Sequence, residues 1–159
     1  MSAWTRRRDP GVAALTVVAI ATAMAADAGA QAPQQADATW KAECGRCHVA
    51  YPPRFLPARS WRAVMQGLER HFGANARVDA RTAASIGAYL EADAESDGDG
   101  ATEPPVLRIT ETRWFQHEHQ RVPAAVWRNP AVRSASNCTA CHRDADDGDF
   151  SGRAARIPR

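Results

Sequence analysis

The chain has 159 residues, of which 20 are basic and 18 acidic, so its formal net charge at pH 7 is +2. This balance, together with the lack of a basic stripe with interleaved aromatic residues, argues against a nucleic-acid-binding protein. Beyond its apolar N-terminal segment the chain is poor in large aliphatic residues, so a large buried cofactor would supply much of the missing core.

Residues 1–30 have the layout of a secretory signal peptide. Arginines at 6–8 form a positive start, an apolar run of 16 residues spans 11–26, and small residues follow at 28–30. The apolar run is shorter than the about 20 residues that a membrane-spanning helix needs. We therefore expect cleavage, with Ala30 favoured over Ala25 and Ala28 as the site, export to the periplasm, and no retained membrane span.

The next segment contains short helical patterns and no long alternating strand pattern. We expect a helix over 36–47, leading into the first cysteine pair. A second helix is predicted from Ser60, taken as its N-cap, to Phe72, with Gly73 ending it. A third is predicted from the N-cap Asp79 to about 92. The predicted structure is therefore mainly helical, with much irregular chain.

A change in composition at 93–105 indicates a boundary. This segment is acidic, contains glycine and ends in two prolines, so we interpret it as a linker between domains 31–92 and 106–159. The second domain is predicted to begin with a short extended segment at 106–109. A helix over 112–120 should follow, and then irregular chain.

The sequence C-x-x-C-H occurs twice, which is the attachment motif of c-type haem. Two residues between the cysteines allow both sulfurs to reach the vinyl groups of one haem, and the following imidazole then lies under the iron. Each domain holds one copy, so we predict two haem-centred halves and two covalently bound haem c groups. The copies are Cys44, Cys47 and His48, and Cys138, Cys141 and His142.

Paired cysteines have three other uses in proteins. They are a structural zinc site, two disulfides in an exported protein, and a redox-active C-x-x-C of the thioredoxin type at Cys44. None of the three explains why a histidine follows both pairs at the same position. The four cysteines of the chain are all used by the two motifs.

The second ligands of the two irons come from a short list. After signal removal the candidates are His71, His117 and His119, with Met65 as the one remaining methionine. His71 follows the apolar face of its predicted helix and is favoured, although a capping role at the helix end is the alternative. Met65 is more typical of a core residue. Helical spacing alone does not separate His117 from His119.

Several further motifs resemble one family. The chain resembles the small bacterial dihaem cytochromes c, a family that includes the electron donor to an oxygen-binding monohaem c-type protein of purple bacteria. The resemblance implies bis-histidine haems, with His71 and His119 as second ligands, and a first half like a cytochrome c helical domain. On nearness in the chain alone, we assign His71 to the first haem and His119 to the second, with crossed pairing between the halves as the alternative. The resemblance rests on Ala50-Tyr51-Pro52-Pro53, Leu56 to Trp61, His71 to Ala76, Arg108-Ile109-Thr110, Trp114-Phe115 with His119, Asn137 to His142, Phe150 and Ile157-Pro158.

Two bis-histidine irons would leave no open coordination position, which points to electron transfer. The predicted function is a periplasmic carrier of single electrons and not an enzyme. Its predicted partner is a redox protein, either a small oxygen-binding c-type haem protein or a membrane cytochrome. The alternatives are a haem enzyme and a gas- or redox-sensing module, each of which requires an open iron.

Overall fold

The computed structural model describes residues 27–97 and 104–158 of the chain. Within these residues every named element is an α-helix or a 3-10 helix, joined by long irregular segments. The prediction of a mainly helical fold with much irregular chain is confirmed. The elements are α1 Asp27–Cys44, η1 Pro53–Phe55, α2 Ala58–Gln66, η2 Leu68–Arg70, α3 Ala80–Ala92, η4 Ile109–Glu111, α4 Arg113–Glu118, α5 Ala124–Trp127, η5 Cys138–Ala140 and η6 Ala145–Asp147.

Helix α1 differs at both ends from the helix predicted over 36–47. It begins at Asp27, inside the predicted signal segment 1–30, of which residues 1–26 lie outside the described part of the chain. It ends at Cys44, because the amide of Gly45 closes the last turn on the carbonyl of Lys41 at 2.9 Å. No described helix has the length and apolar character needed to cross a membrane.

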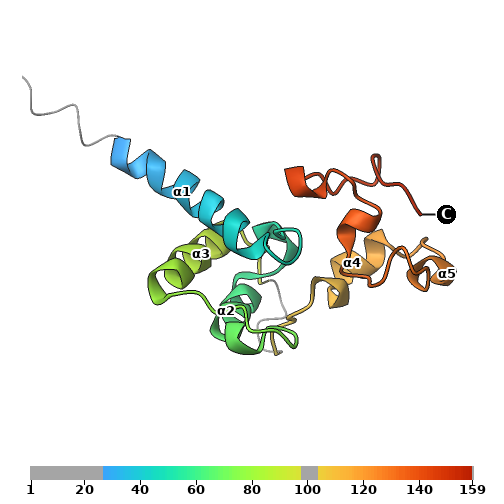
Figure 1. Cartoon of the computed structure of the whole chain (residues 1–159), viewed down its shortest axis with the longest axis horizontal. Coiled ribbons are helices and arrows are strands. Elements are labelled where there is room, and N and C mark those ends of the chain that lie inside the picture. The colour runs from blue at the N-terminus through green and yellow to red at the C-terminus, as the bar shows by residue number, and fades with distance from the viewer. Residues whose placement is uncertain (1–26, 98–103, 159) are drawn as a thin grey trace, which may run out of the picture.

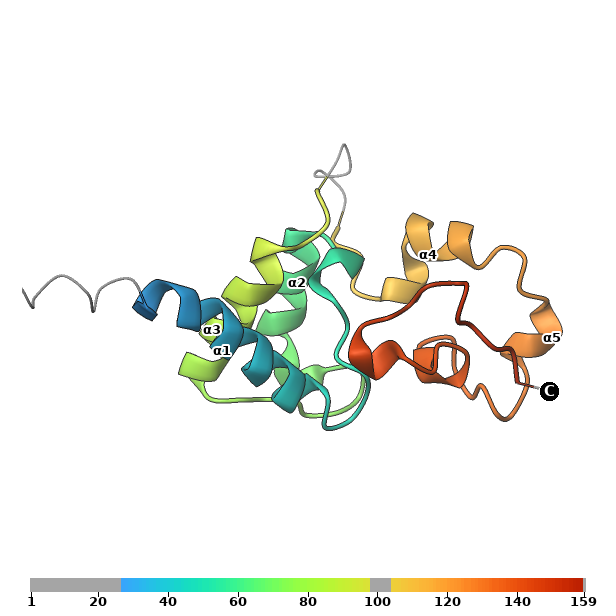
Figure 2. The ribbon, with the colours of Figure 1, turned by 90° about the horizontal axis from the view of Figure 1, so that it is seen from above.

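Three helices form the core of the first half. Helices α1 and α2 both pack against α3 (Figures 1 and 2). Between them lies a cluster of five side chains with at most 6% of their surface exposed, which holds these elements together: Trp40, Leu56, Trp61, Ile86 and Leu90. The Trp61 indole N–H donates to the carbonyl of Pro53 at 2.6 Å, so η1 is tied to α2.

The predicted boundaries of α2 are wrong. Its N-cap is Pro57, because the amides of Ser60 and Trp61 already bond to the Pro57 carbonyl. Ser60 is therefore not the cap, and its side chain is completely buried inside the helix. The helix ends at Gln66, where Gly67 breaks it, and η2 continues the chain toward His71. The segment predicted as one helix is thus an α-helix and a 3-10 turn.

Helix α3 agrees with the prediction. The Asp79 carboxylate accepts hydrogen bonds from the backbone N–H groups of Arg81 and Thr82, at 3.0 and 3.1 Å. These are two of the amides that a helix start leaves without partners. Ile86 and Leu90, one turn apart on the same face, are buried against the core.

The second half has shorter elements and fewer buried side chains. Helix α4 begins after the N-cap Thr112, whose hydroxyl accepts from the amide of Phe115 at 3.1 Å. Its start agrees with the predicted helix 112–120, but it ends earlier, at Glu118. Residues 106–108, predicted to be extended, belong to no named element, and the backbone at Arg108 is extended. Ile109, the last residue of that prediction, opens η4 instead. The buried apolar residues of the second half are Phe115, Val132 and Ala145.

The two halves are in contact. Both views show α1, α2 and α3 on one side and α4 and α5 on the other (Figures 1 and 2). Phe55 of the first half is 6% exposed and lies 4.9 Å from the Trp114 ring and 4.8 Å from the Phe150 ring, measured between centroids. The start of the predicted linker packs on the first half, where the Glu95 amide donates to Leu56. Residues 98–103 of that linker lie outside the described residues.

Candidate cofactor sites

The first C-x-x-C-H motif lies in the turn that follows α1. A Cβ atom at Gly45 would collide with the carbonyl oxygen of Lys41, so only glycine fits between the end of the helix and the next cysteine. The Nδ1 of His48 donates to the carbonyl of Val49 at 2.7 Å. This bond fixes the ring and leaves Nε2 as the nitrogen that can bind a metal.

His71 faces His48 across this site. The two ring centroids are 6.1 Å apart and the ring planes differ by 23°. Burial, and to a lesser extent the proximity of His48, lowers the pKa of His71. The neutral imidazole, which is the metal-binding form, is therefore favoured at this position.

The turn after His71 has an unusual backbone. Phe72 has φ of +49°, a left-handed conformation that is uncommon for a residue other than glycine, and Gly73 follows at +97°. The conformation sets the Phe72 ring edge-on to His71, with centroids 4.8 Å apart. The guanidinium of Arg108, from the second half, lies 4.3 Å from the centre of the Phe72 ring. Strain of this kind is found where a side chain must be held in place.

The second motif is folded differently from the first. Cys138–Ala140 forms the 3-10 helix η5, and the amide of His142 bonds to the carbonyl of Cys138 at 2.8 Å. Burial lowers the pKa of His142, with His119 adding to the effect and the Ser151 backbone and Asp149 opposing it. The Nδ1 of His142 is buried and has no hydrogen bond of good geometry.

His119 is the partner of His142 in the second site. Their ring centroids are again 6.1 Å apart, but the ring planes differ by 78°. The His119 Nδ1 donates to the carbonyl of Phe115 at 2.9 Å, which leaves its Nε2 free. The ring stacks on Phe115 at 4.0 Å and lies 5.9 Å from Trp127. Two aromatic rings and a backbone bond thus orient this imidazole.

The two remaining ligand candidates lie elsewhere. The side chain of His117 is 75% exposed and lies 3.2 Å from the Glu118 carboxylate. Met65 packs against the core cluster of the first half. The structure thus brings together His48 with His71 and His119 with His142, and it leaves His117 at the surface.

All four cysteines lie in described residues and none forms a disulfide. Burial raises the pKa of both Cys44 and Cys138 to about 11, and it also raises the pKa of Cys141. Within residues 27–97 and 104–158 no group of three or more His, Cys, Asp or Glu side chains is arranged to hold a metal ion on its own. The geometry therefore gives no support to the zinc alternative.

Each site can be tested for its fit to a haem iron. A metal–imidazole nitrogen bond is about 2 Å long and the ring centre lies about 1 Å behind that nitrogen, so two imidazoles on opposite sides of one metal ion have centres roughly 6 Å apart. Both histidine pairs have this separation, 6.1 Å in each case. A C-x-x-C motif precedes one histidine of each pair. The residues present fit two covalently held haems.

The motifs quoted from the sequence include Tyr51 and Phe150, but they do not show that these rings lie beside the imidazoles. The Tyr51 ring stacks on His48 with centroids 4.8 Å apart, and the Phe150 ring lies 6.1 Å from His142. Burial raises the pKa of Tyr51 to about 12. Tyr51 comes three residues after His48, a short spacing that could have drawn attention to it. Phe150 comes from the tail, and no local spacing places it beside His142.

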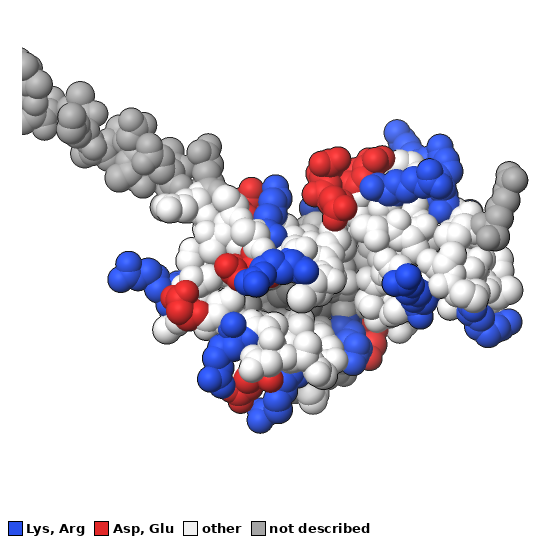
Figure 3. All heavy atoms as spheres, viewed as in Figure 1, with Lys and Arg blue, Asp and Glu red and all other residues white. Residues whose placement is uncertain are grey.

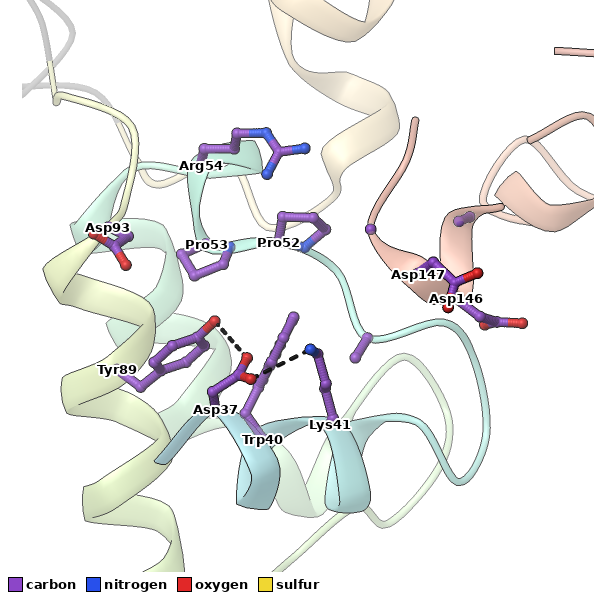
Figure 4. Close-up of a pocket in the computed structure, with 13 residues that line it drawn as sticks. Asp37, Trp40, Lys41, Pro52, Pro53, Arg54, Tyr89, Asp93, Asp146 and Asp147 are labelled. Atoms are coloured by element: carbon purple, nitrogen blue, oxygen red, sulfur yellow. Dashed lines mark hydrogen bonds and ion pairs between the residues drawn. The ribbon is translucent and has the colours of Figure 1, made fainter. Parts of the chain in front are cut away.

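A pocket of about 400 Å³ opens between α1, α3, residues 50–54 and residues 145–148 (Figure 4). Its lining includes four carboxylates and two basic side chains but none of the cysteines or histidines of the two motifs. Tyr89 and Lys41 both contact Asp37 inside it, at 3.0 and 3.3 Å. The pocket is therefore separate from the cofactor sites.

Charged side chains of both signs are spread over the surface in the view of Figure 3. In the second half, the exposed acidic residues Asp144, Asp146, Asp147 and Asp149 come directly after the second motif. A mixed surface of this kind provides local patches for protein contacts, and no single sign of charge dominates.

Comparison with known proteins gives consistent matches. A sequence model described as "Dihaem cytochrome c" matches residues 40–150. The X-ray structure of a dihaem cytochrome c from Shewanella baltica is 39% identical, with a TM-score of 0.67, and the match covers 77% of this chain and 94% of that chain. A search of curated protein sequences found no significant match.

Two structures from Rhodobacter sphaeroides are also similar. A crystal structure of the protein called DHC is 41% identical with a TM-score of 0.61, and the match covers 70% of this chain and 95% of that chain. A dihaem cytochrome c structure from the same organism is 38% identical with a TM-score of 0.64, covering 70% of this chain and 94% of that chain.

Proposed function

Because the chain belongs to the dihaem cytochrome c family, we propose that it carries single electrons between redox proteins through two bis-histidine haems. Membership of this family makes the chain a redox electron-transfer cytochrome with two covalently bound haem c groups. We propose four further properties: the ligand set of the irons, the absence of enzymatic activity, the partners and the compartment.

The observation that supports the ligand set is the equal separation of the two imidazole pairs, 6.1 Å in both sites. In the proposal, Cys44 and Cys47 attach the first haem, and His48 and His71 bind its iron. The second site is built in the same way, from Cys138, Cys141, His142 and His119.

A haem held in this manner supplies a one-electron iron couple. The protein's part is to hold four imidazoles in place and to keep water from the iron. Backbone hydrogen bonds to the carbonyls of Val49 and Phe115 orient the rings of His48 and His119. The aromatic rings of Tyr51 and Phe115 stack on these imidazoles and exclude water. If the four imidazoles bind the two irons as proposed, no coordination position would be left for a substrate. We therefore propose that the protein is an electron carrier and not an enzyme.

The proposed partner is a redox protein, either a small oxygen-binding c-type haem protein or a membrane cytochrome. Covalent attachment of haem takes place outside the cytoplasmic membrane in bacteria, and the sequence of residues 1–30 favours export. We therefore propose a periplasmic protein with a cleaved signal, an N-terminal haem domain at 31–92, an acidic linker at 93–105 and a C-terminal haem domain at 106–159.

Electron paramagnetic resonance of the oxidised protein tests the ligand set. Both irons should be low-spin, and the two signals should differ because the imidazole planes are inclined by 23° in the first site and by 78° in the second. Near-parallel rings split the iron d orbitals more than near-perpendicular rings, so the second haem should give the more anisotropic signal.

Two results would contradict the proposal. A high-spin signal at full haem occupancy would mean an iron with an open position, which favours a haem enzyme or a gas- or redox-sensing module. A weak far-red absorption band typical of Met–iron coordination would place Met65 on an iron in place of His71.

A further inference from the structure

Tyr51 is a single side chain that contacts both cofactor sites. Its ring stacks on His48 of the first motif, with centroids 4.8 Å apart and planes inclined by 17°. Its hydroxyl donates to the backbone carbonyl of Ser136 at 2.7 Å, across 85 residues of sequence. Ser136 precedes Cys138 of the second motif by two residues. One residue therefore joins a histidine of the first site to the chain that leads into the second.

The chain around Tyr51 is stiff. Pro52 and Pro53 follow it, both are buried, and proline fixes the backbone torsion φ. The carbonyl of Pro53 accepts the Trp61 indole N–H at 2.6 Å, which ties this segment to α2. Tyr51 consequently has a fixed position relative to the first half.

The acceptor side of the bond is also held in place. The amide of Asn137 bonds to the carbonyl of Ser134 at 3.0 Å, and its side-chain amide donates to the carbonyl of Val132 at 3.0 Å. Val132 is one of the few fully buried residues of the second half. The Ser136 carbonyl thus belongs to a turn anchored in that half, and the Tyr51 bond connects two rigid segments.

We propose that Tyr51 is a positioning residue that fixes the two haem sites relative to each other and so sets the rate of electron transfer between them. The proposal rests on the proposed function, since it assumes that electrons pass between the two sites. Electron tunnelling slows steeply with distance, so a residue that fixes the separation also fixes the rate. The aromatic contacts of Phe55 hold the halves together by packing, whereas the Tyr51 bond is directional and ends beside the second motif.

The test compares Tyr51→Phe with Tyr89→Phe in the holoprotein. Each variant keeps its ring and loses one hydroxyl, and these are the two tyrosines of the chain. Tyr89 bonds to Asp37 at 3.0 Å, between α3 and α1 within the first half (Figure 4). It therefore controls for the loss of a long-range tyrosine hydrogen bond away from both motifs.

The first measurement is amide hydrogen exchange in the turn at 137–142. A net hydrogen bond contributes about 0.5–1.5 kcal/mol, so Tyr51→Phe should speed exchange of this turn by roughly two- to tenfold. Tyr89→Phe should leave it unchanged. The second measurement is electron equilibration between the haems after fast injection of one electron, which should be slower in Tyr51→Phe only.

The outcomes separate this inference from the proposed function. Unchanged exchange at 137–142 in Tyr51→Phe, or an equal change in both variants, would overturn the role of Tyr51 even if the wild-type protein is a bis-histidine carrier. Faster exchange at 137–142 with an unchanged rate between the haems would overturn the link to electron transfer. An open iron in the wild-type protein would instead contradict the proposed function, and the exchange data would still report on the Tyr51 bond.

Discussion

His117 and His119 are two residues apart at the end of α4, yet their surroundings differ greatly. The His119 ring is held between the Phe115 carbonyl, the Phe115 ring and Trp127, whereas the side chain of His117 is 75% exposed beside Glu118. A side chain with a fixed orientation is suited to bind an iron, and one in solvent is not. Helical spacing cannot reveal this difference, because it depends on Trp127 of another helix.

Replacing these histidines one at a time should give opposite results. His119→Ala should open one iron and create rapid carbon monoxide binding by the reduced protein at about one haem per chain. His117→Ala should leave the spectrum and the carbon monoxide response unchanged. Optical titration of both purified variants measures this directly. If His117→Ala opens the site, the ligand assigned in α4 is wrong.

The sequence was informative about individual chemical groups. The repeated C-x-x-C-H motif predicts both cofactor sites, and nearness in the chain favours grouping His71 with the first motif and His119 with the second. The structure brings these same rings together. It could not be seen from sequence that Phe72 takes a left-handed conformation beside His71, because phenylalanine rarely does so.

At the scale of elements, the outcome differs from helix to helix. The predicted cap Asp79 opens α3 through local hydrogen bonds, whereas the predicted cap Ser60 lies inside α2. Thr112, where the predicted helix 112–120 begins, caps α4. The start of α2 was misplaced because Pro57, with no side-chain oxygen, provides the first turn through its backbone carbonyl. Its end was misplaced because apolar spacing runs on through a 3-10 turn.

The Asp79 cap makes the stability of α3 depend on pH. The hydrogen bond from the Thr82 hydroxyl, followed by those from the backbone amides, lowers the pKa of Asp79 from its ordinary value of 3.8. The ionised carboxylate therefore contributes its full stabilisation of the folded state at pH values above the ordinary pKa of 3.8, which applies to the unfolded chain. This stabilisation is lost as the pH falls through the lower pKa of the folded state.

Thermal unfolding of Asp79→Ala and Asp79→Asn tests this cap. At neutral pH, Asp79→Ala should lower the Tm by a few degrees, and Asp79→Asn by less, because an amide oxygen can still cap the helix. The difference between wild type and Asp79→Asn should shrink as the pH is lowered below about 3.8. A difference that does not depend on pH would show that the ionised carboxylate is unimportant.

At the scale of the whole molecule, the contacts between the halves were beyond the reach of sequence analysis. The Tyr51–Ser136 bond and the packing of Phe55 on Trp114 and Phe150 join segments that are far apart in sequence. Tyr51, Trp114 and Phe150 lie in the quoted family motifs, but no spacing pairs them with Ser136 or Phe55. Local patterns identify what each half contains, but they carry no information on how the halves meet.

Phe55 should contribute strongly to the stability of the assembled molecule. It is 6% exposed and packs on aromatic rings of the second half, so Phe55→Ala should lower the free energy of unfolding by about 3–5 kcal/mol. Denaturant unfolding of the holoprotein measures this change. Ile157→Ala is the matched control, because Ile157 is 52% exposed and its loss should cost less than about 0.5 kcal/mol. Equal effects of the two substitutions would argue against the packing role of Phe55.

The central claim is that all four axial positions of the two irons are filled by histidines of this chain. Carbon monoxide binding to the fully reduced, unmodified protein tests it most directly, because a bound histidine must leave before carbon monoxide can enter. The account predicts that the reduced spectrum changes slowly or not at all on addition of carbon monoxide. Prompt binding at one haem per chain would contradict the account and would favour a gas-binding or catalytic role.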